Sequence, residues 1–541
     1  MAKLFKKYPL IIICLIVAIM LLPNLETIQV TIMEARNFIT AREMIQDNNW
    51  LLTTMNGEAR YEKPPLPTWL TAFSGLLFGV KSVFGMRLPA ILMIMVLAVF
   101  SFKLSETILQ NKTHSTINTL ILITSFYIIG ITIEAPWDIF THAFMMVAIY
   151  YLFIFFKSKN TNWKHVIFAA LFIGCSILSK GPVSFYVLLL PFLLAYGFSF
   201  KYKNIKTKIL PIVTTLVLAI VIGGWWYFYI RFEDPTTFAA ITSKETGNWT
   251  SYNVRPFYYY WSFFTQSGLW TIPAFISLLY PYLKTRVINL KAYKFTLLWT
   301  LFAVVLLSII PEKKSRYLMP VLIPLALNIG FYIEYLIRKF KTLEDKRETV
   351  PVYFNFGLIA LVGIVTPFLL YFKFADQLST NLFQFILFAI IVFVLGLMIL
   401  TQLIKKEIRT VFLLTTAFFA AVFLFGLPLT KSFTTDNFKP ISELSKQNNN
   451  SLYIINNIAP EVIWHYGEKI PQIYKKNGIF NLPAKNEFMV LANKISQKDI
   501  YKISKTYSIE RLATYDLNES APHSKQYKDR LITKYYYLKK K

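Results

Sequence analysis

Residues 382–403 read LFQFILFAIIVFVLGLMILTQL and contain no Asp, Glu, Lys or Arg. A helix of this length would be about 33 Å long, which is enough to cross a hydrocarbon core of about 30 Å. Comparable apolar runs recur along the chain and predict about thirteen membrane spans. They lie near residues 8–24, 88–106, 116–133, 138–157, 165–179, 182–199, 209–230, 267–283, 295–310, 317–338, 353–373, 382–403 and 410–428.

The composition is that of a polytopic membrane protein. Of the 541 residues, 55% are hydrophobic, 17% are aromatic and only 16% are charged, whereas soluble domains average about 25% charged residues. The formal net charge of +28 comes from short basic clusters between apolar runs. This pattern indicates loop charge rather than the basic face of a nucleic-acid-binding protein. Cys14 and Cys175 lie inside apolar runs, so no disulfide framework is expected.

The basic loops predict the orientation of the chain. With a cytoplasmic N-terminus, the positive-inside rule places the most basic short loops in the cytoplasm; these are residues 157–164, 201–208, 284–294, 338–347 and 405–409. The N-terminal apolar run is interpreted as a retained span, because no small-residue cleavage site follows it. An odd number of spans then places the C-terminal tail outside the cytoplasm.

The chain therefore divides into two predicted domains, and the fold class is mainly α. Residues 1–430 form a transmembrane domain with two long outer loops, at 25–65 and 231–266. Residues 431–541 are polar and form a small soluble extracytoplasmic α/β domain. In that tail, strand-like runs alternate with helix-like stretches, and these runs lie at 451–455, 487–492 and 531–538.

Ionisable residues occur where spans are expected to emerge on the outer side. Charged groups at the membrane edge are costly and by default indicate function. Basic side chains there are suited to hold an anionic phosphate; they are Lys63, Lys180, Lys313, Lys314 and Arg316. A carboxylate, from Glu34 or Asp138, is suited to take a proton from an acceptor hydroxyl. Together these groups predict the transfer of a group from a phospholipid-like donor.

Several motifs carry a family resemblance. The stretch MEARNFITAREM at 33–44 is followed by NWL at 49–51 and YEKPPL at 61–66. Further matches follow in the same order, with Asp138, SKGP at 179–182, WWY at 225–227, PFYYY at 256–260 and KSRYLMP at 314–320. Over roughly residues 1 to 330 the chain resembles the aminoarabinose transferase branch of the GT-C glycosyltransferases. These enzymes are relatives of the dolichyl-phosphate-mannose protein mannosyltransferases.

The resemblance implies an enzyme of the bacterial inner membrane with its active site on the extracytoplasmic side. Its donor would be a polyprenyl-phosphate sugar, transferred with inversion to lipid A or, in related branches, to a protein or another glycan. Lys63 would hold the donor phosphate with help from Tyr317 and from neighbouring residues, namely Glu62, Lys180, Lys314 and Arg316. Glu34 and Arg36 would lie in the catalytic loop, with Asp138 as a further catalytic group.

One residue departs from the family pattern. The family usually has an Asp-Glu pair in the first loop, whereas here Met33 precedes Glu34. An acceptor phosphate, as on lipid A, is already anionic near neutral pH and needs little help from a base. For a Ser or Thr hydroxyl acceptor, Glu34 becomes indispensable. The sequence shows no His-rich or Cys-rich ligand set, so dependence on a divalent metal stays open.

Each candidate also has a structural interpretation. Lys63 could be a snorkelling lysine, Glu34 and Arg36 a surface ion pair, and Asp138 a helix cap. Lys313 and its neighbours could bind lipid head groups. A lipid-linked sugar transporter or flippase is the competing class. Transporters usually carry repeated halves, and the sequence shows none, which favours an enzyme.

Overall fold

The computed structural model describes residues 7–134, 136–444, 451–476 and 478–541. The chain forms two compact units. The first unit comprises Met1–Glu26, Tyr61–Pro67 and Arg87–Pro428. The second comprises Thr27–Arg60, Thr68–Met86 and Leu429–Lys541. The tail thus shares a unit with most of the first predicted outer loop, a grouping that the sequence alone did not suggest.

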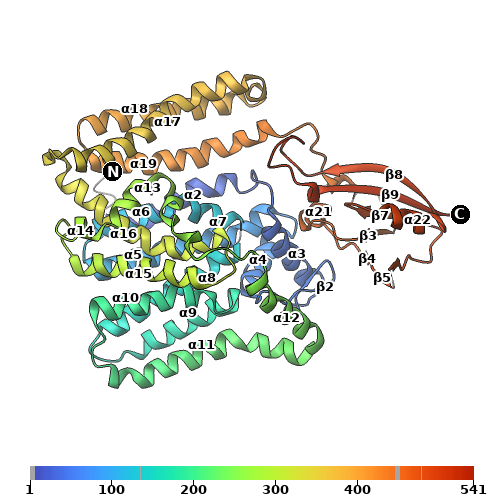
Figure 1. Ribbon diagram of the computed structural model, residues 1–541, viewed down its shortest axis with the longest axis horizontal. Helices are drawn as coiled ribbons and strands as arrows, with labels where there is room; N and C mark the ends of the chain where they lie inside the picture. Colours follow the sequence, from blue (N-terminus) through green and yellow to red (C-terminus); the bar gives the residue numbers. More distant parts are fainter. Residues whose placement is uncertain (1–6, 135, 445–450, 477) are drawn as a thin grey trace. The chain divides into compact units, whose positions relative to one another are not determined.

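Long apolar helices make up the first unit (Figure 1). Nine helical segments among the described residues are long and apolar enough to cross a membrane. They are built on α5 (Val83–Leu109), α8 (Pro136–Lys157), α9 (Trp163–Lys180), α11 (Ile205–Glu233), α15 (Leu290–Ile309), α16 (Met319–Lys339), α17 (Lys346–Ser379), α18 (Leu382–Ile404) and α19 (Ile408–Ala421). A tenth span is possible where α6 (Lys112–Ile123) and α7 (Phe126–Glu134) meet at a bend of 49°.

Three of the expected spans differ in the structure. Residues 8–24 and 182–199 form shorter apolar helices, α2 (Pro9–Leu21) with η1 (Leu22–Asn24), and η2 (Phe185–Leu189) with α10 (Leu190–Phe200). Residues 267–283 are broken into the end of η4 (Phe263–Trp270), α13 (Thr271–Ser277) and α14 (Tyr280–Leu283). The break begins at Gly268, whose φ of +67° only glycine adopts readily. Pro281, which lacks a backbone N–H, lies in the last of these short helices.

Burial distinguishes central from peripheral helices in this unit. In the helical segment that contains α16, 89% of the most apolar stretch is buried. The corresponding share is 22% for α17 and 28% for α18. An apolar helix that is buried all round belongs to the core of a bundle, and α16 packs against α6 and α15. Two helices that expose apolar residues this widely are suited to face lipid. Helices α8, α9 and α11 pack side by side (Figure 1).

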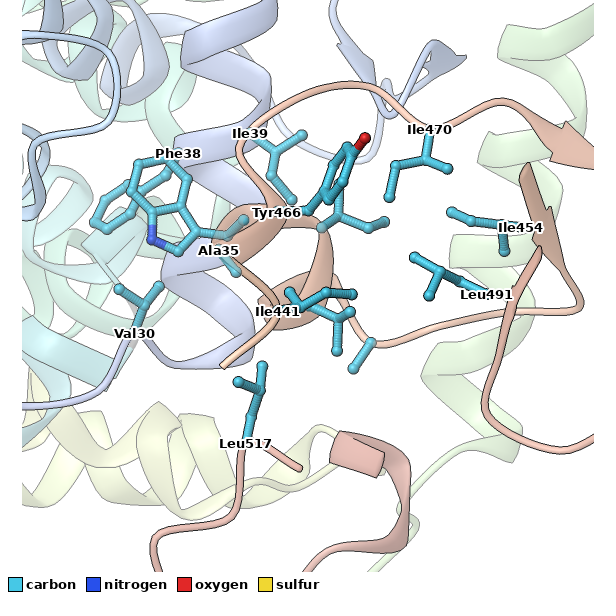
Figure 2. Close-up of a cluster of buried hydrophobic side chains, with 14 of the residues drawn as sticks. Val30, Ala35, Phe38, Ile39, Ile441, Ile454, Tyr466, Ile470, Leu491 and Leu517 are labelled. Atoms are coloured by element: carbon cyan, nitrogen blue, oxygen red, sulfur yellow. The ribbon is translucent and has the colours of Figure 1, made fainter. Parts of the chain in front are cut away.

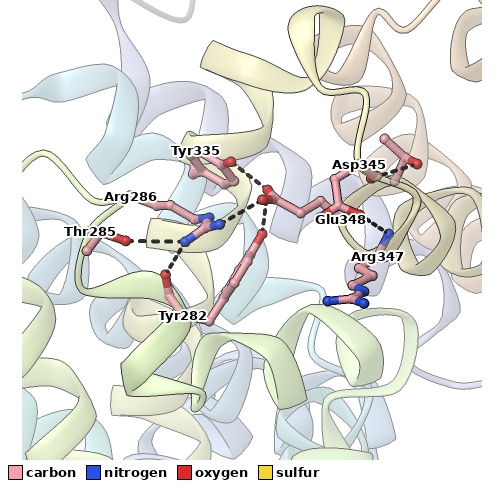
Figure 3. A network of polar contacts seen from close by, with 8 residues as sticks. Tyr282, Thr285, Arg286, Tyr335, Asp345, Arg347 and Glu348 are labelled. Carbon is pink, nitrogen blue, oxygen red and sulfur yellow. Dashed lines mark hydrogen bonds and ion pairs between the residues drawn. The ribbon is translucent and has the colours of Figure 1, made fainter.

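A polar network joins α14, α16 and α17 (Figure 3). Glu348, in the first turn of α17, accepts hydrogen bonds from Tyr282 at 2.9 Å and Tyr335 at 2.6 Å. Arg286 donates to the other carboxylate oxygen at 2.7 Å and to the Tyr282 carbonyl at 2.8 Å. The guanidinium also lies 4.1 Å from the centre of the Tyr282 ring. The three bonds to Glu348 hold the start of α17 against α14 and α16.

The second unit contains a mixed five-stranded sheet. Its strand order is β4-β3-β7-β9-β8, formed by β4 (Gln472–Ile473), β3 (Leu452–Ile455), β7 (Glu487–Ala492), β9 (Ile532–Lys540) and β8 (Tyr507–Asp516). Strand β3 runs parallel to β4 and β7, whereas β9 is antiparallel to β7 and β8. The three strand-like runs predicted in the tail form β3, β7 and β9. Helices α21 (Pro460–Tyr466) and α22 (Gln497–Ser504) accompany the sheet.

The same unit contains α3 (Ile32–Gln46), the hairpin β1 (Thr54–Met55) and β2 (Glu58–Ala59), and α4 (Leu66–Phe78). One face of α3 enters a core that it shares with the tail (Figure 2). Phe38 and Ile39 of α3 lie in this core with Ile441, Tyr466 and Leu491 of the tail. The tail and this part of the first loop therefore fold around common apolar side chains.

Candidate functional site

Asp138 and Lys180 form an ion pair between α8 and α9. Asp138 is 3% exposed, and the Lys180 side chain is 10% exposed. Asp138 lies in the first turn of α8 and Lys180 is the last residue of α9, so each charge complements its own helix dipole. Gly181, with φ of +74°, ends α9 directly after the lysine. Two residues that the sequence singled out separately are therefore partners.

Tyr317 lies among three cations. It belongs to η5 (Ser315–Leu318), a short helical turn that precedes α16. From the centre of its ring, Lys180 Nζ is 5.3 Å away, Lys314 Nζ 5.6 Å and the Arg316 guanidinium carbon 5.9 Å. All three distances fall within the range of cation–π attraction, about 6 Å. Cations from two different parts of the chain therefore lie next to the Tyr317 ring.

Glu312 provides the second carboxylate of this cluster. Its Oε1 lies 2.5 Å from Lys314 Nζ and accepts a hydrogen bond from the Tyr317 hydroxyl at 3.3 Å. Burial lowers the pKa of Lys314, but the bond to Glu312 and the nearby Tyr317 outweigh burial, and the pKa is raised overall. Lys314 is therefore a cation throughout the neutral range.

The loop at 252–260 fixes the backbone of this segment. Val254 and Glu312 form an antiparallel bridge. The Tyr260 hydroxyl accepts a hydrogen bond from the Lys314 amide at 2.9 Å and donates to the Lys314 carbonyl at 3.0 Å. Lys313 points elsewhere, because its Nζ donates to the carbonyls of Arg255 at 3.1 Å and Ile310 at 2.6 Å. Burial lowers the pKa of Lys313, and its bonds give it a structural role.

The cluster has a net positive charge. Three cations, Lys180, Lys314 and Arg316, surround Tyr317 together with the carboxylates Asp138 and Glu312. It lies where α8 begins, where α9 ends and where α16 is about to begin. A positive cluster of this kind, at the ends of apolar helices, is suited to bind an anionic head group at a membrane surface.

Sequence reasoning missed some groups near this cluster. His142 lies one helical turn after Asp138 and is 1% exposed, with Nδ1 3.1 Å from the Ser184 hydroxyl. Its spacing of four residues from Asp138 on one helix was the available signal. Tyr260 was singled out only as part of the motif at 256–260. Its partner, the Lys314 backbone, is remote in sequence, so no local pattern could indicate the contact.

Lys63 and Glu62 lie in the Tyr61–Pro67 segment of the first unit. The Lys63 Nζ is 4.0 Å from Glu245 of α12 (Pro235–Ser251), and Glu62 is partly buried. Tyr61 donates a hydrogen bond to Asp234 at 3.2 Å. Burial raises the pKa of Tyr61 to about 12, and the hydrogen bond to the Asp234 carboxylate contributes a smaller part of this rise. The phenol is therefore neutral when it makes this bond. The segment is thus attached to Asp234, the N-cap of α12, and to Glu245 within that helix.

Glu34 and Arg36 lie in the second unit, on α3. Glu34 is 1% exposed and completes a capping box: its Oε2 accepts from the Thr31 amide at 2.9 Å, and the Thr31 hydroxyl accepts from the Glu34 amide at 3.4 Å. The Arg36 carbonyl accepts from Arg60 Nη1 at 3.1 Å. The structure therefore gives Glu34 a definite structural role at the start of α3.

A divalent metal would need several converging acidic or imidazole ligands. Within the described ranges, no group of three or more His, Cys, Asp or Glu side chains meets that requirement. The cluster around Tyr317 offers two carboxylates, and each is already bound to a lysine. In the part of the chain that the structure describes, the side chains therefore offer no ready set of ligands for a divalent metal.

Comparison with known proteins identifies relatives. Residues 62–227 match the family described as dolichyl-phosphate-mannose-protein mannosyltransferase. An uncharacterized protein of Aquifex aeolicus is 26% identical over 75% of both chains. The undecaprenyl phosphate-alpha-4-amino-4-deoxy-L-arabinose arabinosyl transferases of Shewanella sediminis and Serratia proteamaculans are 23% and 22% identical, over 55% and 61% of this chain. These matches cover 54% and 60% of the two transferases.

The fold also has solved counterparts. ArnT from Cupriavidus metallidurans in the apo state is 14% identical and superposes with a TM-score of 0.65, covering 99% of this chain and 98% of that one. The same protein bound to undecaprenyl phosphate gives a TM-score of 0.64, with 97% of each chain covered. The chain therefore has an ArnT-like fold, and the resemblance found in its motifs is confirmed.

Proposed function

We propose that this chain, which is similar to the aminoarabinose transferases, is a membrane glycosyltransferase that takes its sugar from a polyprenyl-phosphate donor. The observation that carries the proposal is the positive cluster around Tyr317, at the ends of apolar helices. A lipid-linked phosphate has its charge at the membrane surface and its chain in the bilayer, so it needs cations at such a place. The family match and the ArnT-like fold support the same activity.

In this mechanism the chain's cations hold the sugar donor's phosphate. Lys180, Lys314 and Arg316 offer charge-assisted hydrogen bonds, and Tyr317 adds a hydroxyl and a ring. Lys63 and Glu62 complete the donor site. Phosphate is the leaving group when the bond to the anomeric carbon breaks, so cations beside it stabilise the charge that develops in the transition state. Attack from the opposite face gives inversion.

The acceptor determines what Glu34 must do. Its carboxylate is bound to the Thr31 amide, and a base with this partner has part of its acceptor capacity in use. Lipid A phosphate needs little help from a base, which makes it the preferred acceptor for a chain that has Met33 before Glu34. Direct displacement by that phosphate, with Glu34, Arg36 and Asp138 orienting the reactants, is the resulting mechanism.

A protein acceptor is the second candidate. The family matched by residues 62–227 is described by its protein mannosyltransferases, and transfer to Ser or Thr would require Glu34 as a base. Mass spectrometry of lipid A and of surface glycoproteins from cells with and without the gene separates the two candidates. A sugar mass lost from lipid A supports the first, and one lost only from protein supports the second.

The proposed topology has about thirteen spans, counting shorter apolar helices such as α2 and α10, with a cytoplasmic N-terminus. The basic loops support this orientation. It places the active site, and the tail at 431–541 as a soluble domain, on the extracytoplasmic side of a bacterial inner membrane, with all the spans within residues 1–430. A cysteine introduced at exposed Tyr501 tests it: impermeant maleimide should label intact spheroplasts. Labelling only after lysis would contradict this topology.

The activity is tested with Lys63→Ala in purified protein supplied with polyprenyl-phosphate sugars. We expect transfer to fall by about a hundredfold or more, because a charge-assisted contact to phosphate contributes about 3 kcal/mol. Lys164→Ala is the control, since Lys164 is exposed at the first turn of α9. Equal turnover in wild type and Lys63→Ala would remove Lys63 from the donor site. Movement of the sugar lipid across vesicles without transfer would instead identify a flippase.

A further inference from the structure

The tail holds the helix that carries Glu34 and Arg36. Residues 35, 38, 39 and 42 of α3 recur at the spacing of one helix face. Phe38 meets the Trp464 ring of α21 edge-on, with ring centres 5.2 Å apart. The Arg42 guanidinium carbon lies 5.7 Å from the centre of the same ring. One tryptophan of the tail therefore contacts two successive turns of α3.

Loss of the Trp464 ring should destabilise the fold, because Arg42 is buried against it. The side chain is 0% exposed, and none of its three nitrogens has a hydrogen-bond partner among the described residues. A buried guanidinium without such partners depends on the remaining attractions, here the face of Trp464 and the charges of Glu43 and Glu468. Removal of the indole would leave Arg42 with neither a ring nor a hydrogen bond.

The hairpin that follows α3 is also bound to the tail. The side-chain amide of Asn56 donates to the Ile470 carbonyl at 2.8 Å and accepts from the backbone N–H of Ile470 at 2.8 Å. Tyr474 donates to Glu58 at 2.6 Å. Glu43 of α3 in turn accepts a hydrogen bond from the backbone N–H of Asn56 at 2.6 Å. The hairpin therefore links α3 to the tail a second time, through hydrogen bonds.

We propose that the tail is a scaffold for α3, and that Trp464 is a positioning residue for the transfer reaction. This inference rests on the proposed function, because it assigns Glu34 and Arg36 to the reaction. Both residues lie within about one turn of Phe38, the residue that meets Trp464. An independent binding module would not share its core with the catalytic helix, as this tail does (Figure 2).

The test compares Trp464→Ala, Trp464→Phe and Tyr501→Ala in the full chain. Tyr501 is an exposed aromatic residue of α22, in the same tail, and is the matched control. For Trp464→Ala we expect kcat to fall about tenfold or more, with KM for the polyprenyl-phosphate sugar changed by less than about twofold. Phenylalanine at 464 should restore kcat to within about threefold of wild type, because it keeps a ring against Phe38 and Arg42.

Hydrogen exchange provides the readout that does not need activity. Amides of α3 should lose protection in Trp464→Ala while strands β7 and β9 keep theirs. Lost α3 protection with unchanged kcat would overturn the positioning role, and so would a rise in KM alone. If the tail unfolds in Trp464→Ala, Asn56→Ala replaces it as the test. The same result is expected, a fall in kcat with KM nearly unchanged. A wild-type protein inactive on every polyprenyl-phosphate sugar would instead refute the proposed function, while exchange still tests the scaffold.

Discussion

Lys180 and Asp138 depend on each other inside the bundle. Both side chains are buried and form an ion pair. Lys180→Ala leaves the carboxylate buried without its cation, which should lower the free energy of unfolding by about 3 kcal/mol or more. The double variant Asp138→Asn/Lys180→Met removes both charges, so it should regain most of that stability yet remain inactive. Denaturant titration in detergent and a transfer assay measure the two effects.

Recovery of activity in that double variant would show that the pair is only structural. Failure to recover stability would show that Asp138 has other partners strong enough to hold it. Lys164→Ala, at the opposite end of the same helix, should resemble wild type in both measurements, because Lys164 is exposed.

The pH dependence of Lys314 follows from its bond to Glu312. The pKa of Lys314 is raised in the folded protein. The charged Lys314 therefore stabilises the fold fully below pH about 10.5, and this stabilisation is lost only as the pH rises through the higher pKa of the folded state. Binding of undecaprenyl phosphate should therefore not weaken through Lys314 between pH 7 and about 10. Glu312→Gln removes the main group that opposes burial and leaves only Tyr317 to raise the pKa of Lys314, so binding should weaken at a lower pH. Identical pH profiles for both proteins would contradict this assignment.

At the scale of elements, Glu348 holds three helix ends together (Figure 3). Tyr282, Tyr335 and Arg286 all donate to its carboxylate. Glu348→Ala should lower the free energy of unfolding by about 3 kcal/mol, because a partly buried arginine and two hydroxyls lose their acceptor. Glu348→Gln keeps an oxygen and should cost less. Thermal unfolding of both variants measures the difference, and equal melting temperatures for Glu348→Ala and wild type would refute the role.

Continuous apolar helices could be predicted from the sequence, but breaks within apolar stretches could not. The nine long segments coincide with predicted runs, because burial in lipid or protein requires apolar residues throughout. The run at 267–283 is also mostly apolar, yet Gly268 and Pro281 interrupt its backbone. In the tail, β8 was not predicted. Its alternation is interrupted by the irregular pairing between Arg511 and Ala513.

The cluster around Tyr317 was predictable in part as a set of residues, though not as a set of contacts. Lys180, Asp138 and Tyr317 were identified by their place at membrane edges and by motif. Their mutual contacts join segments far apart in the chain, which local patterns do not encode. Lys313 shows the limit most clearly: it looks equivalent to Lys314 in sequence, but its ammonium group is bound by backbone carbonyls.

On the scale of the whole molecule, the chain combines a lipid-facing bundle with a tail that folds onto its own first loop. The bundle contains the cationic cluster, and the second unit contains the helix with Glu34 and Arg36. Under the proposed function, the cluster around Tyr317 is the part that binds the lipid-linked phosphate, and Glu34 and Arg36 are assigned to the acceptor.

The most direct measurement is the affinity of the purified chain for undecaprenyl phosphate, titrated in detergent at fixed salt. Wild type and Lys164→Ala should bind alike, whereas Lys180→Met in the Asp138→Asn background, and Lys63→Ala, should each bind at least about tenfold more weakly, a change of about 1.4 kcal/mol. Equal affinity in all four proteins would contradict the claim that these lysines hold a lipid-linked phosphate.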